Sequence, residues 1–244
     1  MGHNQNPLQN LDYTALEAVR VPRPVDRLDF ISGRVRGKMV FDLGALDETA
    51  IDAKRGTENW LHARLCASAS NVIGMDNSSL LPVNGLNTSN GGLIIHADIF
   101  DLGPVIERHG KPDIVVAGEL IEHLPDTEAF LRSLRQNPAL NGAEFVFSTP
   151  NACCWHNFLI GMAGKESMHR DHLQIYSYKT LRTLFDRAGI ELHALVPCHA
   201  RFHEMLDETH GLKKAAVRGF QGLVNGLEFM APILSAGWVG VARL

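Results

Sequence analysis

The chain has 244 residues, 45% of them hydrophobic and 20% charged, with a formal net charge of −4 at pH 7. These values suit a globular protein with a substantial core and exclude a collagen-like, disordered or strongly basic chain. The slightly acidic balance disfavours nucleic acid as a partner, because a phosphate backbone selects clustered Lys and Arg. The sequence shows neither a leader-like segment nor a membrane-spanning apolar run, and its four cysteines lack a Cys-x-x-Cys spacing. We therefore expect a cytoplasmic protein with reduced thiols and no membrane association.

The chain divides into a short N-terminal part and one domain. Residues 1–37 are polar or aperiodic and are predicted to form an arm, with a short helix at 12–20, and a covering segment. Residues 38–244 contain no internal repeat and no long linker. The predicted strands cover residues 38–45, 71–76, 93–96, 113–117, 143–148, 190–196 and 237–242, and the predicted helices cover 58–68, 126–134, 177–188 and 212–229, with an irregular segment at 152–176.

The alternation of strands and helices predicts an α/β fold. Apolar, β-branched strands separated by helices at this spacing are typical of a doubly wound, mostly parallel sheet. The sequence therefore predicts a Rossmann-like, seven-stranded sheet whose last strand is antiparallel. In such open sheets, ligands bind in the crevice beyond the carboxyl ends of the strands.

The fourth predicted strand leads into the most informative stretch of the chain, 112–125. Gly118 lets the chain leave the strand, and Glu119, Glu122 and His123 follow at positions i, i+3 and i+4. This spacing predicts that the three ionisable groups share one face of a helical turn. Crowded carboxylates must be solvated, share a proton or hold a cation, so a divalent metal is one interpretation. In the alternative interpretation, Glu119 meets a cofactor hydroxyl while the other two residues are solvated.

Acidic residues also end the first two strands, and a third acidic residue follows the third strand. Asp42 with Gly44, Asp76 with Asn77, and Asp98 with Ile99 follow strands in order, and Glu119 follows the fourth. A carboxylate after a strand can accept two hydrogen bonds from a vicinal diol. This ordered set resembles the class I S-adenosylmethionine-dependent methyltransferases over roughly residues 38–244. The resemblance implies that the cofactor contacts Asp42, Gly44, Asp76, Asn77, Asp98, Ile99, Gly118 and Glu119.

One turn departs from that family. Its glycine-rich turn usually reads Asp-x-Gly-x-Gly-x-Gly, whereas Gly44 is followed here by Ala45-Leu46-Asp47-Glu48. The resemblance implies that the backbone passes close to the cofactor, which glycine permits. Either the loop up to Gly56 contacts the cofactor in another way, or affinity is weakened. A non-catalytic binding protein with a methyltransferase fold is therefore an alternative.

The motif Glu119-x-x-Glu122-His123 further resembles the metal motif of ubiquinone-biosynthesis O-methyltransferases and small-RNA 2′-O-methyltransferases. In the latter, a later histidine shortly before a Ser or Thr that opens a helix completes the set. His172, five residues before Ser177, fits that placement better than His169. The implied ligands are Glu119, Glu122, His123 and His172, and the ion would be Mg²⁺, Mn²⁺, Zn²⁺ or Fe²⁺. The alternative is that His123 packs under the helix and His172 is a general base or a loop histidine.

Taken together, the resemblance implies an S-adenosylmethionine-dependent enzyme that methylates an oxygen of a small hydroxylated metabolite with the help of a divalent ion. Glu122, His123 and His172 are the predicted catalytic residues. Methylation of RNA 3′ ends on the 2′-oxygen is the main alternative. The late histidines, such as His199, fit a substrate-pocket wall and a solvent-exposed surface equally well. The oligomeric state is left open.

Overall fold

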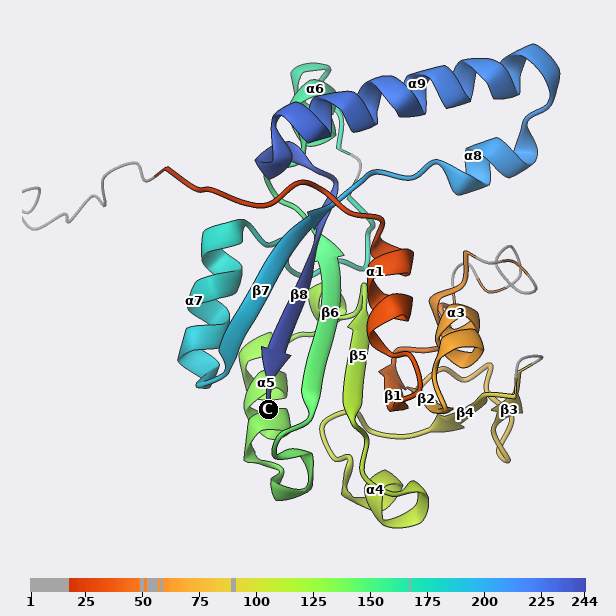
Figure 1. The fold of residues 1–244 in the computed structure, drawn as a ribbon, viewed down its shortest axis with the longest axis vertical. Helices are drawn as coiled ribbons and strands as arrows, with labels where there is room; N and C mark the ends of the chain where they lie inside the picture. Colours follow the sequence, from red (N-terminus) through yellow and green to blue (C-terminus); the bar gives the residue numbers. More distant parts are fainter. Residues whose placement is uncertain (1–17, 49–50, 52–56, 58, 89–90, 167) are drawn as a thin grey trace, which may run out of the picture.

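A computed structural model describes residues 18–48, 51, 57, 59–88, 91–166 and 168–244. The predicted helix at 12–20 and much of the loop after Glu48 lie outside these residues. The centre of the fold is one eight-stranded sheet of order β3-β4-β2-β1-β5-β6-β8-β7 (Figure 1). Its strands are β1 (Met39–Leu43), β2 (Asn71–Asp76), β3 (Leu86–Asn87), β4 (Leu93–His96), β5 (Ile114–Gly118), β6 (Glu144–Pro150), β7 (Glu191–Cys198) and β8 (Gly237–Arg243).

The pairing of the strands confirms the predicted fold class. Strands β4, β2, β1, β5 and β6 run parallel, whereas β8 is antiparallel to both β6 and β7. The structure adds the two-residue edge strand β3, which pairs antiparallel with β4. It is too short for its hydrophobic pattern to show in the sequence. Because β1, β2 and β5 are parallel neighbours, the residues at their carboxyl ends gather at one edge of the sheet.

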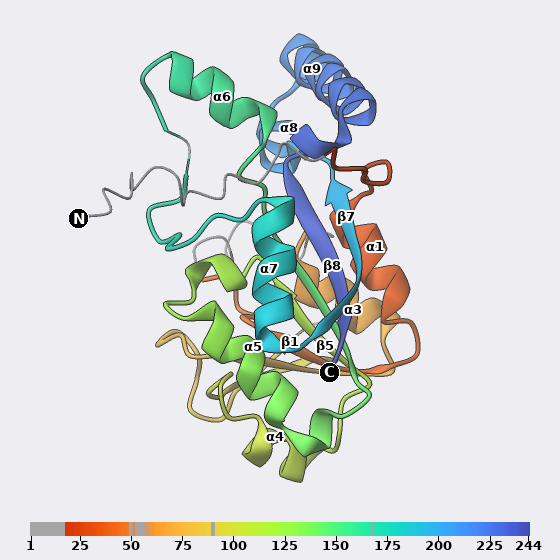
Figure 2. The same cartoon turned by 90° about the vertical axis from the view of Figure 1, so that its left-hand side faces the viewer.

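Helices cover both faces of the sheet (Figures 1 and 2). One face packs against α1 (Arg27–Arg34) and α3 (Leu61–Ser68), with Ile31, Val40 and Leu65 in its core. The other face packs against α4 (Gly103–His109), α5 (Thr127–Gln136) and α7 (Tyr178–Ala188). Helices α1 and α4 were not predicted, because neither has a clear apolar stripe in the sequence. The division of the chain after residue 37 stays a prediction.

Three of the predicted helix ends are present in atomic detail. Ser177 and Thr180 form a capping box at the start of α7, although Thr replaces the more usual Glu. Gly189 ends the same helix in the left-handed conformation, with φ of 72°. The side chain of Asp126 caps α5 by accepting from the amide of Ala129 at 2.8 Å. These local signals fixed the boundaries well because they depend on neighbours in sequence.

A helical cap lies beyond the carboxyl ends of the parallel strands (Figures 1 and 2). It contains α6 (Trp155–Met162), α8 (His203–Glu208) and α9 (Gly211–Met230). The prediction of an irregular segment at 152–176 is wrong in part, because α6 forms inside it. Helix α6 has no buried residue, so its sequence carries little amphipathic signal. None of the helices in the described part of the chain has the length and apolar character needed to cross a membrane.

Candidate functional site

Two adjoining cavities occupy the edge where the parallel strands end. The first, here named the strand-tip cavity, has a volume of about 550 Å³ and lies over β1, β2 and β5. The second, here named the helix-roofed cavity, has a volume of about 870 Å³ and extends to α6, α8 and α9. Both volumes fall in the range of ligand sites, roughly 300–1,000 Å³. The residues shared by the two cavities are Arg27, Asn59, Glu119, His169 and His172.

The strand-tip cavity is predominantly acidic and contains most of the predicted cofactor residues. Predicted residues on its wall are Asp42, Gly44, Asp76, Asn77, Gly118 and Glu119. Asp47, Glu48 and Asp171 add further carboxylates, and Arg27 adds a cation. A ligand with positive charge and one anionic group would match this distribution. S-adenosylmethionine has that distribution, because it carries a sulfonium, an ammonium and a carboxylate.

Asp76 holds the turn after β1 in place. Its Oδ2 accepts from the amide of Leu46 at 3.0 Å, and its Oδ1 accepts from the amide of Ser78 at 3.0 Å. Each carboxylate oxygen has a second lone pair, so Asp76 can still accept hydrogen bonds from a bound diol. The same carboxylate therefore orders the protein and faces the cavity.

The turn without the later glycines is packed rather than open. Gly44 takes φ of 72°, which glycine tolerates, and a Cβ there would lie 3.0 Å from Leu120 Cδ1. Ala45 and Leu46 are buried beside Trp60, whose Nε1 donates to the carbonyl of Ala45 at 3.1 Å. Asp47 and Glu48 then line the strand-tip cavity, while residues 49–50 and 52–56 lie outside the described part.

Asp42 is engaged by a partner that the sequence did not suggest. Its Oδ2 lies 2.9 Å from Nδ1 of His62, and both residues are almost completely buried on the wall of the strand-tip cavity. Burial raises the pKa of Asp42 despite this contact. Burial opposes protonation of His62, but hydrogen bonds to Asp42 and Cys66 raise its pKa to about 9. The pair therefore holds one proton at neutral pH.

Gly74 was the available sequence signal for this pair. It interrupts the apolar strand β2 and lies opposite Asp42 in register. A Cβ at Gly74 would come within 2.8 Å of His62 Cε1, so the ring occupies the space that the missing side chain leaves. A glycine inside a strand often marks such a close approach. The sequence did not reveal which side chain approaches.

Arg27 stands at the junction of the two cavities. It comes from α1, and its Nη1 donates to Ser148 Oγ at 3.3 Å. Ser148 Oγ in turn accepts from the amide of Glu119 at 3.1 Å. Arg27 was not predicted as a site residue, because it lies far from the other site residues in the sequence. Only the packing of α1 against the sheet brings it there.

Glu119 leaves the strand in an unusual conformation. Its φ is 52°, in the left-handed region that a residue other than glycine adopts at a cost. The next residues form a 3₁₀ turn, η2 (Ile121–His123), which carries Glu122 and His123. The prediction of one helical face through all three residues therefore holds only for the last two. Glu119 lines both cavities instead.

Three predicted metal ligands converge next to the cavities. A ligand atom from each of Glu122, His123 and His172 lies within 4.8 Å of the other two, and the described residues contain no other such group. His123 and His172 line the strand-tip cavity, and His172 also lines the helix-roofed cavity. Glu119 is not a member of the group, although the sequence placed it among the ligands.

Glu122 is a buried carboxylate with unmet hydrogen-bonding capacity. It is 0% exposed, and neither carboxylate oxygen has a hydrogen-bond partner among the described residues. Burial, followed by the negative charge of Glu119, raises the pKa of Glu122 to about 9. A buried carboxylate without partners is costly, and a bound cation would remove that cost. This group therefore fits a divalent metal.

The surroundings of His123 and His172 also suit metal binding. His123 Nδ1 lies 3.2 Å from the carbonyl oxygen of Asp171, so Nδ1 donates there and Nε2 is left as the nitrogen that could bind a metal. Burial, followed by the nearby His123 and His169, lowers the pKa of His172 and favours its neutral ring. His172 Nδ1 is buried without a hydrogen-bond partner among the described residues. Neutral imidazole is the form that binds metals.

Asp98 and Ile99 lie outside the wall of the strand-tip cavity. Asp98 is exposed after β4, and its Oδ1 accepts from the amide of Phe100 at 2.9 Å. Ile99 packs partly against the core. Their predicted contact with an adenine ring stays a prediction, because they still follow the strand beside β2 at the same edge of the sheet.

Comparisons with known proteins agree with this arrangement. The family described as "Methyltransferase domain" matches residues 26–195, more than half of the chain. A comparison with curated proteins finds no significant match. The fold resembles the methyltransferase domain of a bacterial CtHen1, with TM-score 0.52, 17% identity, 90% of this chain covered and 98% of the other. It also resembles the small RNA methyltransferase HEN1, with TM-score 0.55, 12% identity, 94% of this chain covered and 27% of the other.

At 17% and 12% identity, the two solved structures support only the fold. The family match is a match of the amino-acid sequence, so it shows the family. That match begins at Asp26, so it includes α1 and Arg27 as well as the strand tips. The acidic wall under β1 and β2 lies where this fold binds its ligand. The chain belongs to the methyltransferase-domain family and is a class I S-adenosylmethionine-dependent methyltransferase.

Proposed function

We propose that this enzyme transfers a methyl group from S-adenosylmethionine to an oxygen of a small hydroxylated metabolite, with a divalent metal bound by Glu122, His123 and His172. The observation that carries the proposal is the group of three ligand atoms within 4.8 Å of one another, next to the junction of two cavities. Small O-methyltransferase substrates need a site for the reacting oxygen beside the methyl donor. His172 lies on both cavity walls and so marks that boundary.

Different residues of the chain would bind different groups of the methyl donor. In the strand-tip cavity, Asp76 and Glu119 supply carboxylates for hydroxyl and cationic groups of the methyl donor, and Arg27 supplies a cation for its carboxylate. The donor sulfonium is already activated, so the protein chiefly orients the two reactants and excludes water. A divalent ion held by the three ligands would lower the pKa of a hydroxyl that it binds.

The helix-roofed cavity favours a small acceptor. Its wall includes the aromatic side chains of Trp155, Phe202 and Phe220, and the last two rings stack with centroids 5.6 Å apart. Such walls bind apolar rings by burying their surface and by stacking. With a net charge of −4, the chain also lacks the strongly basic balance typical of nucleic-acid binding.

RNA 3′ ends are the second candidate acceptor. The observation that favours them is the resemblance of the fold to HEN1, which is described as a small RNA methyltransferase. The same three metal ligands would serve a terminal ribose, because its two neighbouring hydroxyls can bind one ion. The two candidates differ in the size and charge of the acceptor, so one assay can compare them.

The test is methyl transfer from radiolabelled S-adenosylmethionine, with and without Mn²⁺, to a set of catechols and to a short RNA. We expect labelled catechol products that depend on Mn²⁺ and vanish with a chelator. Labelling of RNA alone would transfer the proposal to the second candidate. Activity that is indifferent to the chelator, in a protein that binds no ion, would remove the metal from the proposal.

A further inference from the structure

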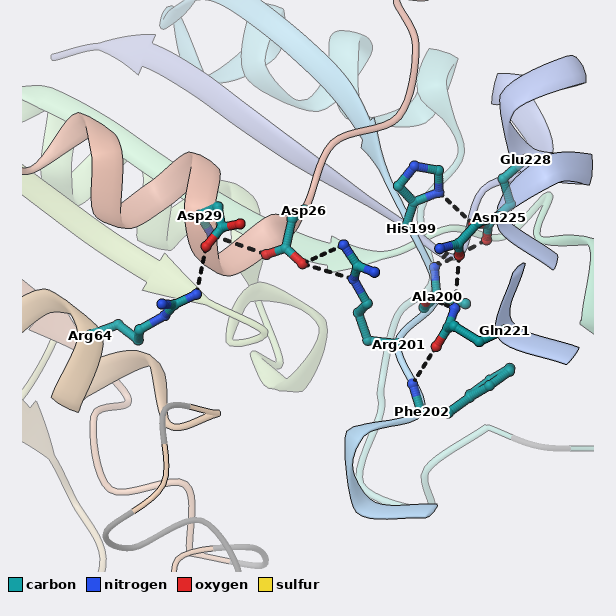
Figure 3. A network of polar contacts seen from close by, with 10 residues as sticks. All are labelled: Asp26, Asp29, Arg64, His199, Ala200, Arg201, Phe202, Gln221, Asn225 and Glu228. Atoms are coloured by element: carbon teal, nitrogen blue, oxygen red, sulfur yellow. Dashed lines mark hydrogen bonds and ion pairs between the residues drawn. The ribbon is translucent and has the colours of Figure 1, made fainter. Parts of the chain in front are cut away.

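The far end of the helix-roofed cavity contains a histidine that the proposed chemistry does not use. His199 follows β7 and lines the cavity, and its Nδ1 lies 2.9 Å from Oε2 of Glu228 (Figure 3). The side chain of His199 is 16% exposed, whereas that of Glu228, on α9, is 0% exposed. A completely buried carboxylate therefore anchors a cavity-lining imidazole.

The hydrogen bonds of Glu228 determine which nitrogen of His199 carries the proton. Oε1 of Glu228 accepts from the backbone amides of Ala200 and Ala236, each at 3.1 Å. Backbone amides only donate, so the carboxylate of Glu228 is the acceptor in this network, and Nδ1 of His199 donates to its Oε2. The Nε2 atom is then the nitrogen available to a molecule in the cavity. It has no hydrogen-bond partner within the described ranges.

The backbone on both sides of His199 is also held. The Gln221 side chain donates to the carbonyl of Ala200 at 2.7 Å and accepts from the amide of Phe202 at 2.8 Å (Figure 3). Arg201 donates through Nε to Oδ2 of Asp26 at 2.7 Å, which joins this segment to the start of α1. A side chain fixed in this way loses little entropy when it binds a ligand.

His199 is too far from the methyl donor to act on the reacting oxygen. In the sheet, β7 is separated from β5 by β6 and β8. Three strand spacings of about 4.8 Å place the two strand tips on the order of 14 Å apart. The cavity nevertheless extends from His172 to His199, with the stacked rings of Phe202 and Phe220 on its wall. It therefore matches an elongated molecule with an apolar middle.

We propose that Nε2 of His199, positioned by Glu228, accepts a hydrogen bond from a second hydroxyl group of the acceptor, at the end remote from the methylated oxygen. The substrate class is then an elongated, ring-containing molecule with hydroxyls at both ends. This inference rests on the proposed function, because it takes the helix-roofed cavity as the acceptor site. His199 is a specificity residue, and Glu228 is a positioning residue.

The test measures binding rather than turnover. Full-length protein saturated with S-adenosylhomocysteine is titrated calorimetrically with 4-phenylphenol and with 4,4′-dihydroxybiphenyl, which differ only in the second hydroxyl. We expect the dihydroxy probe to bind about five-fold more tightly, the effect of one net hydrogen bond. His199→Phe, which keeps the bulk of the ring, and His199→Leu should abolish this preference. His193→Leu, which changes an exposed histidine on β7, the strand that leads to His199, should retain it.

Equal binding of the two probes by the wild type, no binding of either, or a preference that survives both His199 substitutions would overturn the proposal. The role of Glu228 has its own readout, since ¹⁵N NMR of the imidazole should show the Nδ1–H form in the wild type and lose it in Glu228→Gln. An unchanged tautomer in that variant would exclude the positioning role. If the hydroxyl preference is found but no methyl transfer occurs, the proposed function fails while the binding inference stands.

Discussion

Nδ1 of His62 lies 2.9 Å from Oδ2 of Asp42, and the two side chains are only 0% and 3% exposed. The pair lies under the strand-tip cavity, at the residue that the sequence marked as the first cofactor motif. Asp42 thus shares its charge with a histidine inside the protein. We expect any contribution of Asp42 to cofactor binding to work through the position of this pair, because a pair that holds one proton is neutral overall.

The first prediction concerns the stability of the pair as a function of pH. The pKa of His62 rises from 6.5 to about 9 on folding, so its contribution is fully present below about pH 6.5 and is lost as pH rises through about 9. We expect His62 to account for about 3 kcal/mol of the unfolding free energy that the wild type loses over this interval, in addition to the loss from Glu122, whose pKa burial raises to about 9. The measurement is urea unfolding between pH 6 and 9.5. His62→Gln should lose about 3 kcal/mol less than the wild type over this interval, and His193→Gln should follow the wild type. Parallel profiles for all three would contradict the pairing.

The second prediction concerns Arg27. We expect Arg27→Gln to weaken S-adenosylmethionine binding about ten-fold, because it removes a charge-assisted hydrogen bond to the carboxylate of the cofactor. The exposed Arg36→Gln, just beyond the same helix, serves as the control and should bind normally. Calorimetric titration with S-adenosylmethionine measures both. An unchanged Kd in Arg27→Gln would show that the cofactor carboxylate binds elsewhere.

The third prediction separates two neighbouring histidines. His169 lies near His123 and His172, with ring centroids 6.2 and 5.6 Å away, but it is not in the group of three ligands. His172→Ala should weaken Mn²⁺ binding at least about ten-fold, since even the loss of an outer partner of a ligand has an effect of that size. His169→Ala should retain the ion. Metal content after dialysis measures both, and the reverse result would assign the site to His169.

The fourth prediction concerns the junction between α1 and the segment after β7. Asp26 caps α1 by accepting from the amide of Asp29 at 3.0 Å and also pairs with Arg201. Burial opposes ionisation, but the amide of Asp29 and the charge of Arg201 outweigh it and lower the pKa of Asp26 below 3.8. This stabilisation is therefore present above about pH 3.8 and is lost as pH falls through the lowered value.

Asp26→Asn should therefore reduce the unfolding free energy by about 1 kcal/mol at pH 7, with the difference shrinking below pH 4. Asn still caps a helix, so the loss comes chiefly from the charge. The exposed Asp186→Asn is the matched control and should be neutral. Thermal unfolding at pH 7 and pH 3.5 distinguishes the two variants, and an equal loss at both pH values would argue against a charge effect.

The sequence by itself determined where the main strands lie along the chain and which residues follow their carboxyl ends. Apolar β-branched runs identify β1, β2, β4 and β5, and a parallel sheet necessarily gathers their carboxyl ends at one edge. Asp76, Gly118 and Glu119 could be placed in one cavity for that reason. The pair Glu122 and His123 follows from local spacing, and His172 from its distance to the helix cap at Ser177.

Only the tertiary structure decided which side chains complete the two cavities. Arg27, His62 and His199 come from distant parts of the chain, and their roles depend on how α1, α3 and α9 pack against the sheet. Hydrophobic periodicity identifies the buried face of a helix but not the polar group that it meets there. A buried charge is stable only with its partner, and that partner is fixed by packing in space rather than by spacing in sequence.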